Sequence, residues 1–181
     1  MTADITADLD DAAVLALNNA HAAETSHLSA AALGALRAQA FVAAGFDRGA
    51  TAFVIALDAS AAYDNPNFGW FCARCTDFVY IDRVITAPAA RGRGLARALY
   101  RHAIERATAA GRRWLVCEVN AEPPNPGSQA FHDALGFEAV GRAAVASQHK
   151  VVSYLARRLS PAGESARDRP PGASARGPGA A

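Results

Sequence analysis

An acidic residue stands inside an apolar segment near the middle of the chain. Glu118 interrupts the segment 114–119, which otherwise has the apolar, β-rich composition of a buried strand. A carboxylate inside such a strand costs free energy unless it faces a cleft or has a partner. We therefore expect Glu118 to act as a general base in a site. A glutamate on the outer surface is the alternative, because alternation along this strand does not fix its face.

A second carboxylate, Asp82, lies in the strongest predicted strand, residues 78–85. Alternation along this strand puts Asp82 on the same face as Tyr80 and Val84. Asp82 is therefore the second candidate base. Its neighbour Arg83 favours the competing interpretation, a structural ion pair.

A glycine-rich turn, Arg91-Gly92-Arg93-Gly94, joins this strand to a predicted helix. Such a turn exposes unpaired backbone N–H groups at the positive end of the helix dipole, and its glycines let a phosphate approach the backbone. The Walker motif and the dinucleotide-binding G-x-G-x-x-G motif are both absent from the sequence. The turn predicts an anion-binding cradle, and a tight turn with two solvated arginines is the alternative.

The elements that must position these residues alternate between helices and strands. In chain order, the pattern predicts helices at 9–19 and 29–40, a hairpin of strands at 41–46 and 51–57, an irregular aromatic loop at 60–76, the strand at 78–85, a helix from the glycine turn to a cap at Gly111, a strand at 114–119, a helix at 128–135, and strands at 137–142 and 150–155. This order predicts a mixed α/β fold with a strand–loop–helix unit at its centre.

Composition limits the class of protein. Of the 181 residues 51% are apolar, but 46 are alanine, so the predicted core is adequate rather than large. The formal net charge is +1, which argues against a nucleic-acid partner. No apolar run approaches the ~20 residues that cross a bilayer, and the N-terminus is acidic, so we expect no membrane segment and a cytoplasmic protein.

The chain is expected to contain one domain and a tail. Residues 160–181 carry no Val, Leu, Ile or aromatic side chain, so this segment is predicted to be disordered, and the folding unit is predicted to be 1–159. Three cysteines are an odd number, which fits a reduced compartment. Cys72 and Cys75 match C-x-x-C without a second pair, so two reduced thiols are favoured over a metal or redox site.

Two motifs together resemble the GNAT family of acyl-CoA-dependent N-acetyltransferases. The family's loop, R/Q-x-x-G-x-G/A, is matched by Arg91-x-x-Gly94-x-Ala96 after Thr86-Ala87-Pro88. Its second signature is similar to Asn125-x-x-Ser128-x-x-Phe131-His132-x-x-x-Gly136-Phe137. The resemblance implies a mixed, twisted central sheet flanked by helices. It also implies transfer of an acetyl group from acetyl-CoA to a primary amine by direct attack in a ternary complex, with no metal.

The resemblance also implies roles for individual residues. The N–H groups of residues 92–97 would hold the coenzyme A pyrophosphate, the backbone of residues 84–86 would lie along the pantetheine, and Asn125 would face that arm. The implied cofactor-binding residues are Val84, Ile85, Thr86, Arg91, Gly92, Arg93, Gly94, Leu95, Ala96, Arg97, Asn125, Ser128 and Phe131. Glu118 resembles the proton-accepting glutamate of the family's ribosomal-protein N-terminal alanine acetyltransferases.

His132 is where the chain departs most from the family, which has a tyrosine there that protonates the leaving thiolate. An imidazolium can donate that proton near neutral pH. The alternative is a histidine on the helix surface, with water as the donor. The missing tyrosine also leaves room for a different class of function, a non-catalytic acyl-CoA sensor, although Glu118, Asn125 and the complete cradle favour an enzyme.

The acceptor is not specified by any motif. Small-molecule amines, amino acids and protein N-termini all stay open, because the first two helices and the segment 60–76 would shape the acceptor pocket. A homodimer is also left open.

Overall fold

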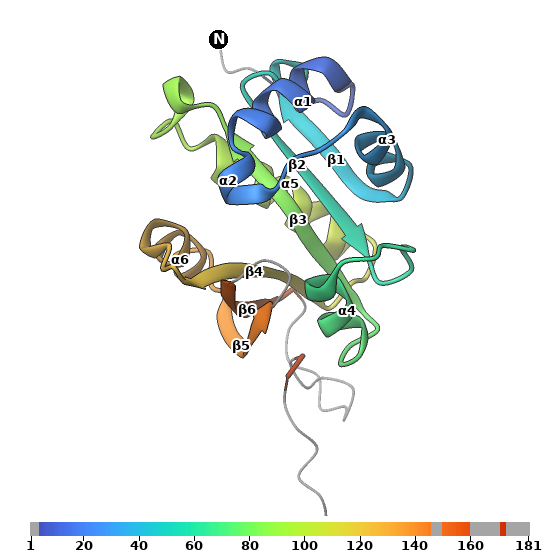
Figure 1. Cartoon of the computed structure of the whole chain (residues 1–181). Helices are drawn as coiled ribbons and strands as arrows, with labels where there is room; N and C mark the ends of the chain where they lie inside the picture. Colours follow the sequence, from blue (N-terminus) through green and yellow to red (C-terminus); the bar gives the residue numbers. More distant parts are fainter. Residues whose placement is uncertain (1–3, 146–149, 160–170, 173–181) are drawn as a thin grey trace, which may run out of the picture.

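One six-stranded sheet, with strand order β1-β2-β3-β4-β6-β5, forms the centre of the computed structural model, which describes residues 4–145, 150–159 and 171–172 (Figure 1). The strands are β1 (Ala40–Phe46), β2 (Ala52–Asp58), β3 (Phe78–Thr86), β4 (Trp114–Glu122), β5 (Glu138–Val145) and β6 (Lys150–Arg158). All neighbours pair antiparallel except β3 and β4, which are parallel. The predicted mixed α/β fold and its first hairpin are confirmed.

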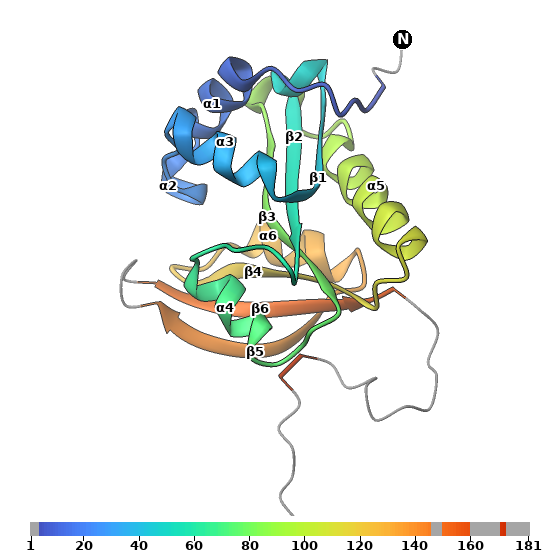
Figure 2. The same cartoon turned by 90° about the vertical axis from the view of Figure 1, so that its right-hand side faces the viewer.

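Helices cover both faces of the half-sheet formed by β1, β2 and β3. The short N-terminal helices α1 (Asp11–Ala20), α2 (Ala22–Thr25) and α3 (Ala30–Ala38) lie on one face, and α5 (Leu95–Ala109) lies on the other (Figure 2). Two buried clusters correspond to these faces, one containing Val14 and Leu33 and the other containing Leu99 and Ala103. The two faces explain why β2 is apolar at nearly every position.

Polar caps set the ends of several helices. The Asp10 side chain accepts from the backbone of α1, and the Ser29 side chain accepts from that of α3. The predicted helices at 9–19 and 29–40 are confirmed, with bounds that differ by one or two residues. The end of α5 is marked by Gly111 at φ +70°, which confirms the predicted cap.

The prediction of an irregular loop over 60–76 is wrong in part. Residues Pro66–Cys72 form α4, whose N-cap Asn65 accepts from the backbone N–H groups of Asn67 and Phe68. An N-cap asparagine followed by proline at the first helical position is a standard helix start. The aromatic residues around it obscured that signal, since they resemble a β-rich composition.

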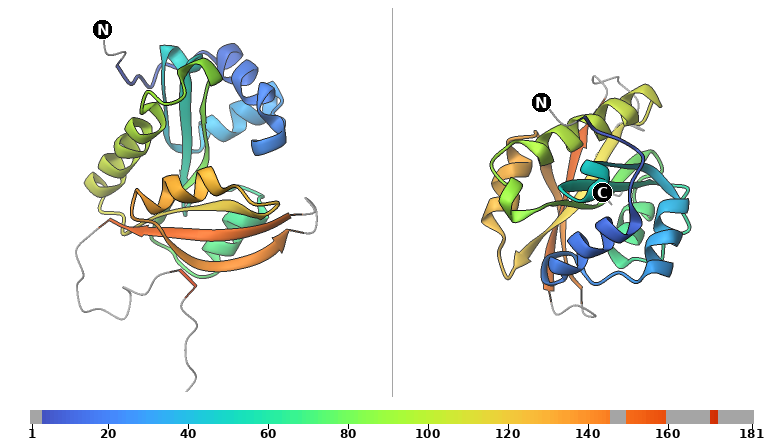
Figure 3. Two further views of the ribbon diagram at one scale, coloured as in Figure 1. Left: turned by 90° about the vertical axis from the view of Figure 1, so that its left-hand side faces the viewer. Right: turned by 90° about the horizontal axis from the view of Figure 1, so that it is seen from above.

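The parallel pairing of β3 with β4 is short. It joins only Phe78 to Trp114, Val79 to Leu115 and Tyr80 to Val116. Beyond these pairs both strands continue, β3 paired only with β2 and β4 only with β6, so the sheet splits between them. Helix α6 (Pro126–Asp133) lies over the β4–β6 half, on the side where α5 covers the other half (Figure 3).

The ends of the chain are described in part. Within the predicted tail 160–181 the structure describes Pro171 and Gly172 alone, and Pro171 is buried. The other residues of that segment lie outside the described part of the chain. Among the described residues, no helix is both long enough and apolar enough to span a bilayer.

Candidate active site

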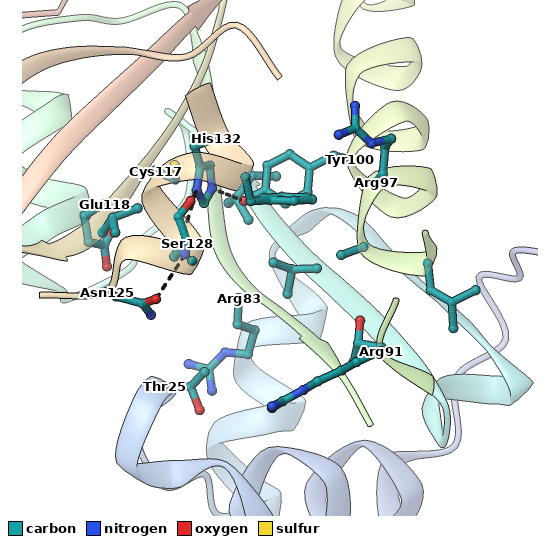
Figure 4. Close-up of a pocket in the computed structure, with 18 of the residues that line it drawn as sticks. Thr25, Arg83, Arg91, Arg97, Tyr100, Cys117, Glu118, Asn125, Ser128 and His132 are labelled. Carbon is teal, nitrogen blue, oxygen red and sulfur yellow. Dashed lines mark hydrogen bonds between the residues drawn. The ribbon is translucent and has the colours of Figure 1, made fainter. Parts of the chain in front are cut away.

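A cavity of about 820 Å³ opens where β3 and β4 separate. Its walls come from the end of β3, the glycine turn and start of α5, the middle of β4, the start of α6, and Thr25 of α2 (Figure 4). Glu118 and Asp82 both line it. Residues far apart in the sequence are therefore collected at the split in the sheet.

Glu118 is held on the cavity wall by two donors. The Tyr80 hydroxyl donates to its Oε2 at 2.8 Å, and the Asn67 side-chain amide of α4 donates to its Oε1 at 3.0 Å. Tyr154 of β6 donates to the Asn67 carbonyl oxygen at 3.0 Å, which fixes the orientation of that amide. Glu118 therefore does not project into bulk solvent as a surface glutamate would.

The surroundings of Glu118 suit a general base. Burial raises the pKa of Glu118 to about 7; the charge of Asp82 also raises it, whereas the hydrogen bonds from Tyr80 and Asn67 lower it. A carboxylate with a pKa near 7 is half ionised at neutral pH and is a much stronger proton acceptor than a solvated glutamate.

Asp82 belongs to an ion pair. Arg83 Nε donates to its Oδ2 at 2.6 Å, and the Tyr63 hydroxyl donates to its Oδ1 at 2.6 Å. Strict alternation would send Arg83 to the opposite face from Asp82, but the β2–β3 register shifts beside them, where Ile55 pairs with Arg83 and Ala56 pairs with Ile81. Both residues of the pair consequently lie in the cavity wall.

The glycine turn forms the opposite wall of the cavity. Gly92 and Gly94 have φ values of +75° and +77°, and a Cβ at either position would meet no atom within 4 Å. The first intrahelical bond of α5 runs from Ala98 N to Gly94 O at 3.0 Å, so the N–H groups of residues 95–97 precede it and have no intrahelical acceptor. The turn thus offers open space and backbone donors to an anion.

Most of the predicted cofactor-binding residues line this cavity. They are Val84, Thr86, Arg91, Gly92, Gly94, Leu95, Ala96, Arg97, Asn125, Ser128 and Phe131. Ile85 and Arg93 do not: Ile85 packs into the core, and Arg93 is exposed. The Asn125 side chain caps α6 by accepting from Ser128 N at 3.0 Å. The buried Thr86 Oγ1 has no hydrogen-bond partner among the described residues.

His132 is buried, so the interpretation of a helix-surface histidine is wrong. Its Nδ1 lies 2.7 Å from the carbonyl oxygen of Ser128, which can only accept, so Nδ1 carries the proton. Nε2 then accepts from the Tyr100 hydroxyl at 2.7 Å. Burial lowers the pKa of His132, which favours the neutral imidazole over the imidazolium.

Several residues of the site were not singled out from the sequence. Asn67, Tyr154 and Tyr100 bear on it through hydrogen bonds that join separate elements, and no short motif contains them. Tyr80 and Arg83 were noted only as neighbours of Asp82. The one usable signal was the helix start at Asn65-Pro66, which would have placed Asn67 in the first turn of a helix.

Cys72 is exposed at the end of α4, Cys75 is half-buried, and Cys117 is buried, and all three are free thiols. Among the described residues, no group of three or more His, Cys, Asp or Glu side chains has the arrangement of a metal site. Within the described part of the chain, Cys72 and Cys75 therefore have no further side chains around them that could complete a metal site.

Comparison with known proteins gives a family match. The sequence model of the Acetyltransferase (GNAT) family matches residues 27–137, which include the strand split, the glycine turn and the whole of α6. No functionally curated protein matches the chain in sequence.

Solved structures match over nearly the whole chain. The ribosomal-protein-S18-alanine N-acetyltransferase from Escherichia coli aligns with a TM-score of 0.64 at 19% identity, covering 89% of this chain and 96% of its own. Ard1 from Thermoplasma volcanium aligns with a TM-score of 0.66 at 12% identity, covering 87% and 98%. The putative acetyltransferase yncA from Salmonella typhimurium, solved with its cofactor acetyl-CoA, aligns with a TM-score of 0.62 at 19% identity, covering 92% and 99%. At these identities the likeness concerns the fold.

Proposed function

The chain belongs to the GNAT acetyltransferase family, and we propose that it transfers an acetyl group from acetyl-CoA to a primary amine by direct attack within a ternary complex. The observation that carries this proposal is Glu118: a carboxylate with two donors and a pKa raised to about 7 by burial, facing the cavity at the split in the sheet.

The cavity fits the cofactor. The open space at Gly92 and Gly94 and the orphaned N–H groups at the start of α5 suit a pyrophosphate, with Arg91 and Arg97 beside them. Among the described residues, the edge of β3 beyond Tyr80 is unpaired on the side of β4, and its backbone groups suit the amide groups of a pantetheine arm. Bound acetyl-CoA would supply an acetyl group activated as a thioester.

Glu118 is the proposed general base. A primary amine must be neutral to attack a carbonyl carbon, and it must lose a proton as its C–N bond forms. The ionised Glu118 accepts that proton directly or through one water molecule. Tyr80 and Asn67 keep the carboxylate in place and favour its ionised form.

The Tyr100–His132 pair is the proposed proton donor to the departing thiolate. Because Nε2 of His132 accepts from Tyr100, the exchangeable proton resides on the Tyr100 hydroxyl. Once Tyr100 has given its proton to the thiolate, Nε2 of His132 has no proton to donate to the phenolate, because the single N–H of the neutral ring is on Nδ1 and donates to the Ser128 carbonyl. Tyr100 must therefore regain a proton from solvent before the next turnover. The proposal replaces the imidazolium donor expected from the sequence with a tyrosine from a different helix.

The decisive experiment is turnover by the Glu118→Gln variant. A screen of amine classes for acetyl-CoA-dependent thiol release identifies a substrate. The variant should then keep its affinity for acetyl-CoA but lose about 10²–10⁴-fold in kcat, the range expected for a lost general base. Wild-type kcat in this variant would contradict the role of Glu118.

The second candidate function is the acyl-CoA sensor. The buried, neutral state of His132 favours it mildly, because that histidine is not a ready acid. A wild-type protein that binds acetyl-CoA but releases no thiol with any class of amine would support the sensor over the enzyme.

A further inference from the structure

One wall of the cavity contains a buried guanidinium that the proposed chemistry does not use. The side chains of Arg83 and Asp82 are only 5% and 2% exposed. Arg83 Nε donates to Asp82, and Nη1 donates to Oδ1 of Asn18 at 2.8 Å. Among the residues whose side chains the structure describes, Nη2 has no hydrogen-bond partner. Nη2 is not one of the buried side-chain atoms that lack a partner among the described residues, so it stays accessible, and Arg83 lines the cavity, where a ligand could accept from it.

The neighbours of Arg83 are already committed to other contacts. Both Asp82 oxygens are taken, one by Tyr63 and one by Arg83 itself. The Asn18 amide nitrogen donates to Asn19 and to the carbonyl oxygen of Ser26, which fixes its Oδ1 toward Arg83. None of these groups can turn to satisfy Nη2, so the guanidinium is held ready for a ligand.

Arg83 is close in the fold to the proposed base. The last pair of the β3–β4 ladder is Tyr80 with Val116, and two residues further along each strand are Asp82 and Glu118. Arg83 follows Asp82 and lines the same cavity as Glu118 and Thr25, and it extends from β3 toward Thr25 (Figure 4). A ligand at Nη2 would therefore lie at the same end of the cavity as the base.

We propose that Arg83 binds a carboxylate of the acceptor, so that the substrate is a small amine carrying a carboxylate near its amino group, such as a free amino acid. This inference rests on the proposed acetyl transfer. A carboxylate brings one negative charge and matches the N–H donors of a guanidinium. A phosphate dianion would meet the charges of Asp82 and Glu118, and a second amino group on the substrate would be repelled by Arg83.

The test compares amino acids with their amides, methyl esters and decarboxylated amines as acceptors at saturating acetyl-CoA. Wild-type protein should favour the acid by about 10- to 100-fold in kcat/KM, as expected for a hydrogen-bonded charge pair. Arg83→Gln should abolish most of this preference, and Arg83→Lys should retain an intermediate one because it keeps the charge but loses the planar fork. Arg101→Gln is the matched control, since it removes an exposed arginine of α5 that is not part of the cavity wall, and it should leave the preference intact.

A readout without turnover separates this inference from the proposed function. The protein saturated with coenzyme A should bind an N-acetyl amino acid more tightly than its amide in calorimetry, and Arg83→Gln should remove the difference. If no amine is acetylated but this difference is present, the carboxylate site stands and the enzymatic proposal fails. Equal use and equal binding of acid and amide by the wild-type protein would overturn the carboxylate site. That wild-type result decides the question even if Arg83→Gln does not fold.

Discussion

Removing the Tyr80 hydroxyl should move the pH profile of acetyl transfer. Tyr80 is fully buried and donates to Oε2 of Glu118 at 2.8 Å, so Tyr80→Phe deletes one of the two donors that stabilise the ionised carboxylate. The ring should stay in place, because it packs edge-on against Phe68 at a centroid distance of 5.5 Å. The change therefore acts on the charge of Glu118 rather than on the core.

The size of the effect follows from the energy of the lost contact. A hydrogen bond to a charged group contributes about 1.5–3 kcal/mol, and 1.36 kcal/mol corresponds to one pKa unit, so the pKa of Glu118 should rise by about one to two units. Its starting value is about 7, raised by burial. The base must be ionised, so the acidic limb of kcat/KM should move up by the same amount. At pH 7 activity should fall by about 5- to 50-fold, and it should recover above pH 9.

Tyr63→Phe is the matched control. It also removes one tyrosine hydroxyl, on a half-buried ring, but from Asp82 rather than from Glu118. Profiles of kcat/KM from pH 5 to pH 10, with melting temperatures at each pH, give the comparison. If the limb stays in place in Tyr80→Phe and moves in Tyr63→Phe, the base is Asp82, and the reasoning about Glu118 is refuted.

Three further predictions concern the cradle, the proton donor and stability. Gly94→Val should weaken acetyl-CoA binding in calorimetry by at least about tenfold, because the valine side chain fills the space beside the N–H groups that lack intrahelical acceptors. The control Gly111→Val, at the similar φ of +70° but at the far end of α5, should lower the melting temperature by a similar amount yet bind acetyl-CoA normally. Tyr100→Phe and His132→Phe should each lower kcat, and the double variant should be no slower than the worse single one, because the two residues act through one hydrogen bond; additive losses would show independent roles. Glu118→Gln should raise the melting temperature at pH 8 but hardly at pH 5. Burial raises the pKa of Glu118 in the folded state from the ordinary 4.5 to about 7, so the native state loses up to about 3 kcal/mol of stability as the pH rises through that range, and glutamine does not carry this cost. The exposed control Glu105→Gln should leave the melting temperature unchanged at both pH values.

The order of elements was predictable from the sequence because each has a local signal. Strand β3 is apolar and β-branched, α5 begins at a glycine turn and ends at Gly111, and Ser29 caps α3. These signals act within a few residues, which is the range over which a sequence pattern can be interpreted. The boundaries of β4 and β6 extend further than predicted because their outer residues are stabilised by pairing with each other, and that pairing is not local.

The site was predictable only where its residues sit in a motif. The glycine turn and the Asn125–Phe137 segment were identified because the cofactor's shape ties them to fixed spacings, and Glu118 because a charge in a buried strand is unusual. The hydrogen-bonding partners of these residues were not predicted, since Asn67 lies 51 positions from Glu118 in the sequence and Tyr100 lies 32 positions from His132. Such contacts depend on how helices pack on the sheet.

The same distinction explains which part of the function the sequence leaves open. The proposed cofactor binding uses backbone N–H groups and open space at glycines, and both are properties of local geometry that can be recognised in the sequence. Acceptor choice depends on Asn18, Tyr63 and Arg83, which come from a helix, a connecting segment and a strand and are joined only by hydrogen bonds. A shift of one residue in the β2–β3 register would turn Arg83 away from the cavity and remove the proposed carboxylate site without altering any motif. Proteins with the same cofactor motif can therefore differ in substrate through register alone, and the register of β3 is the feature to compare first among structures with this fold.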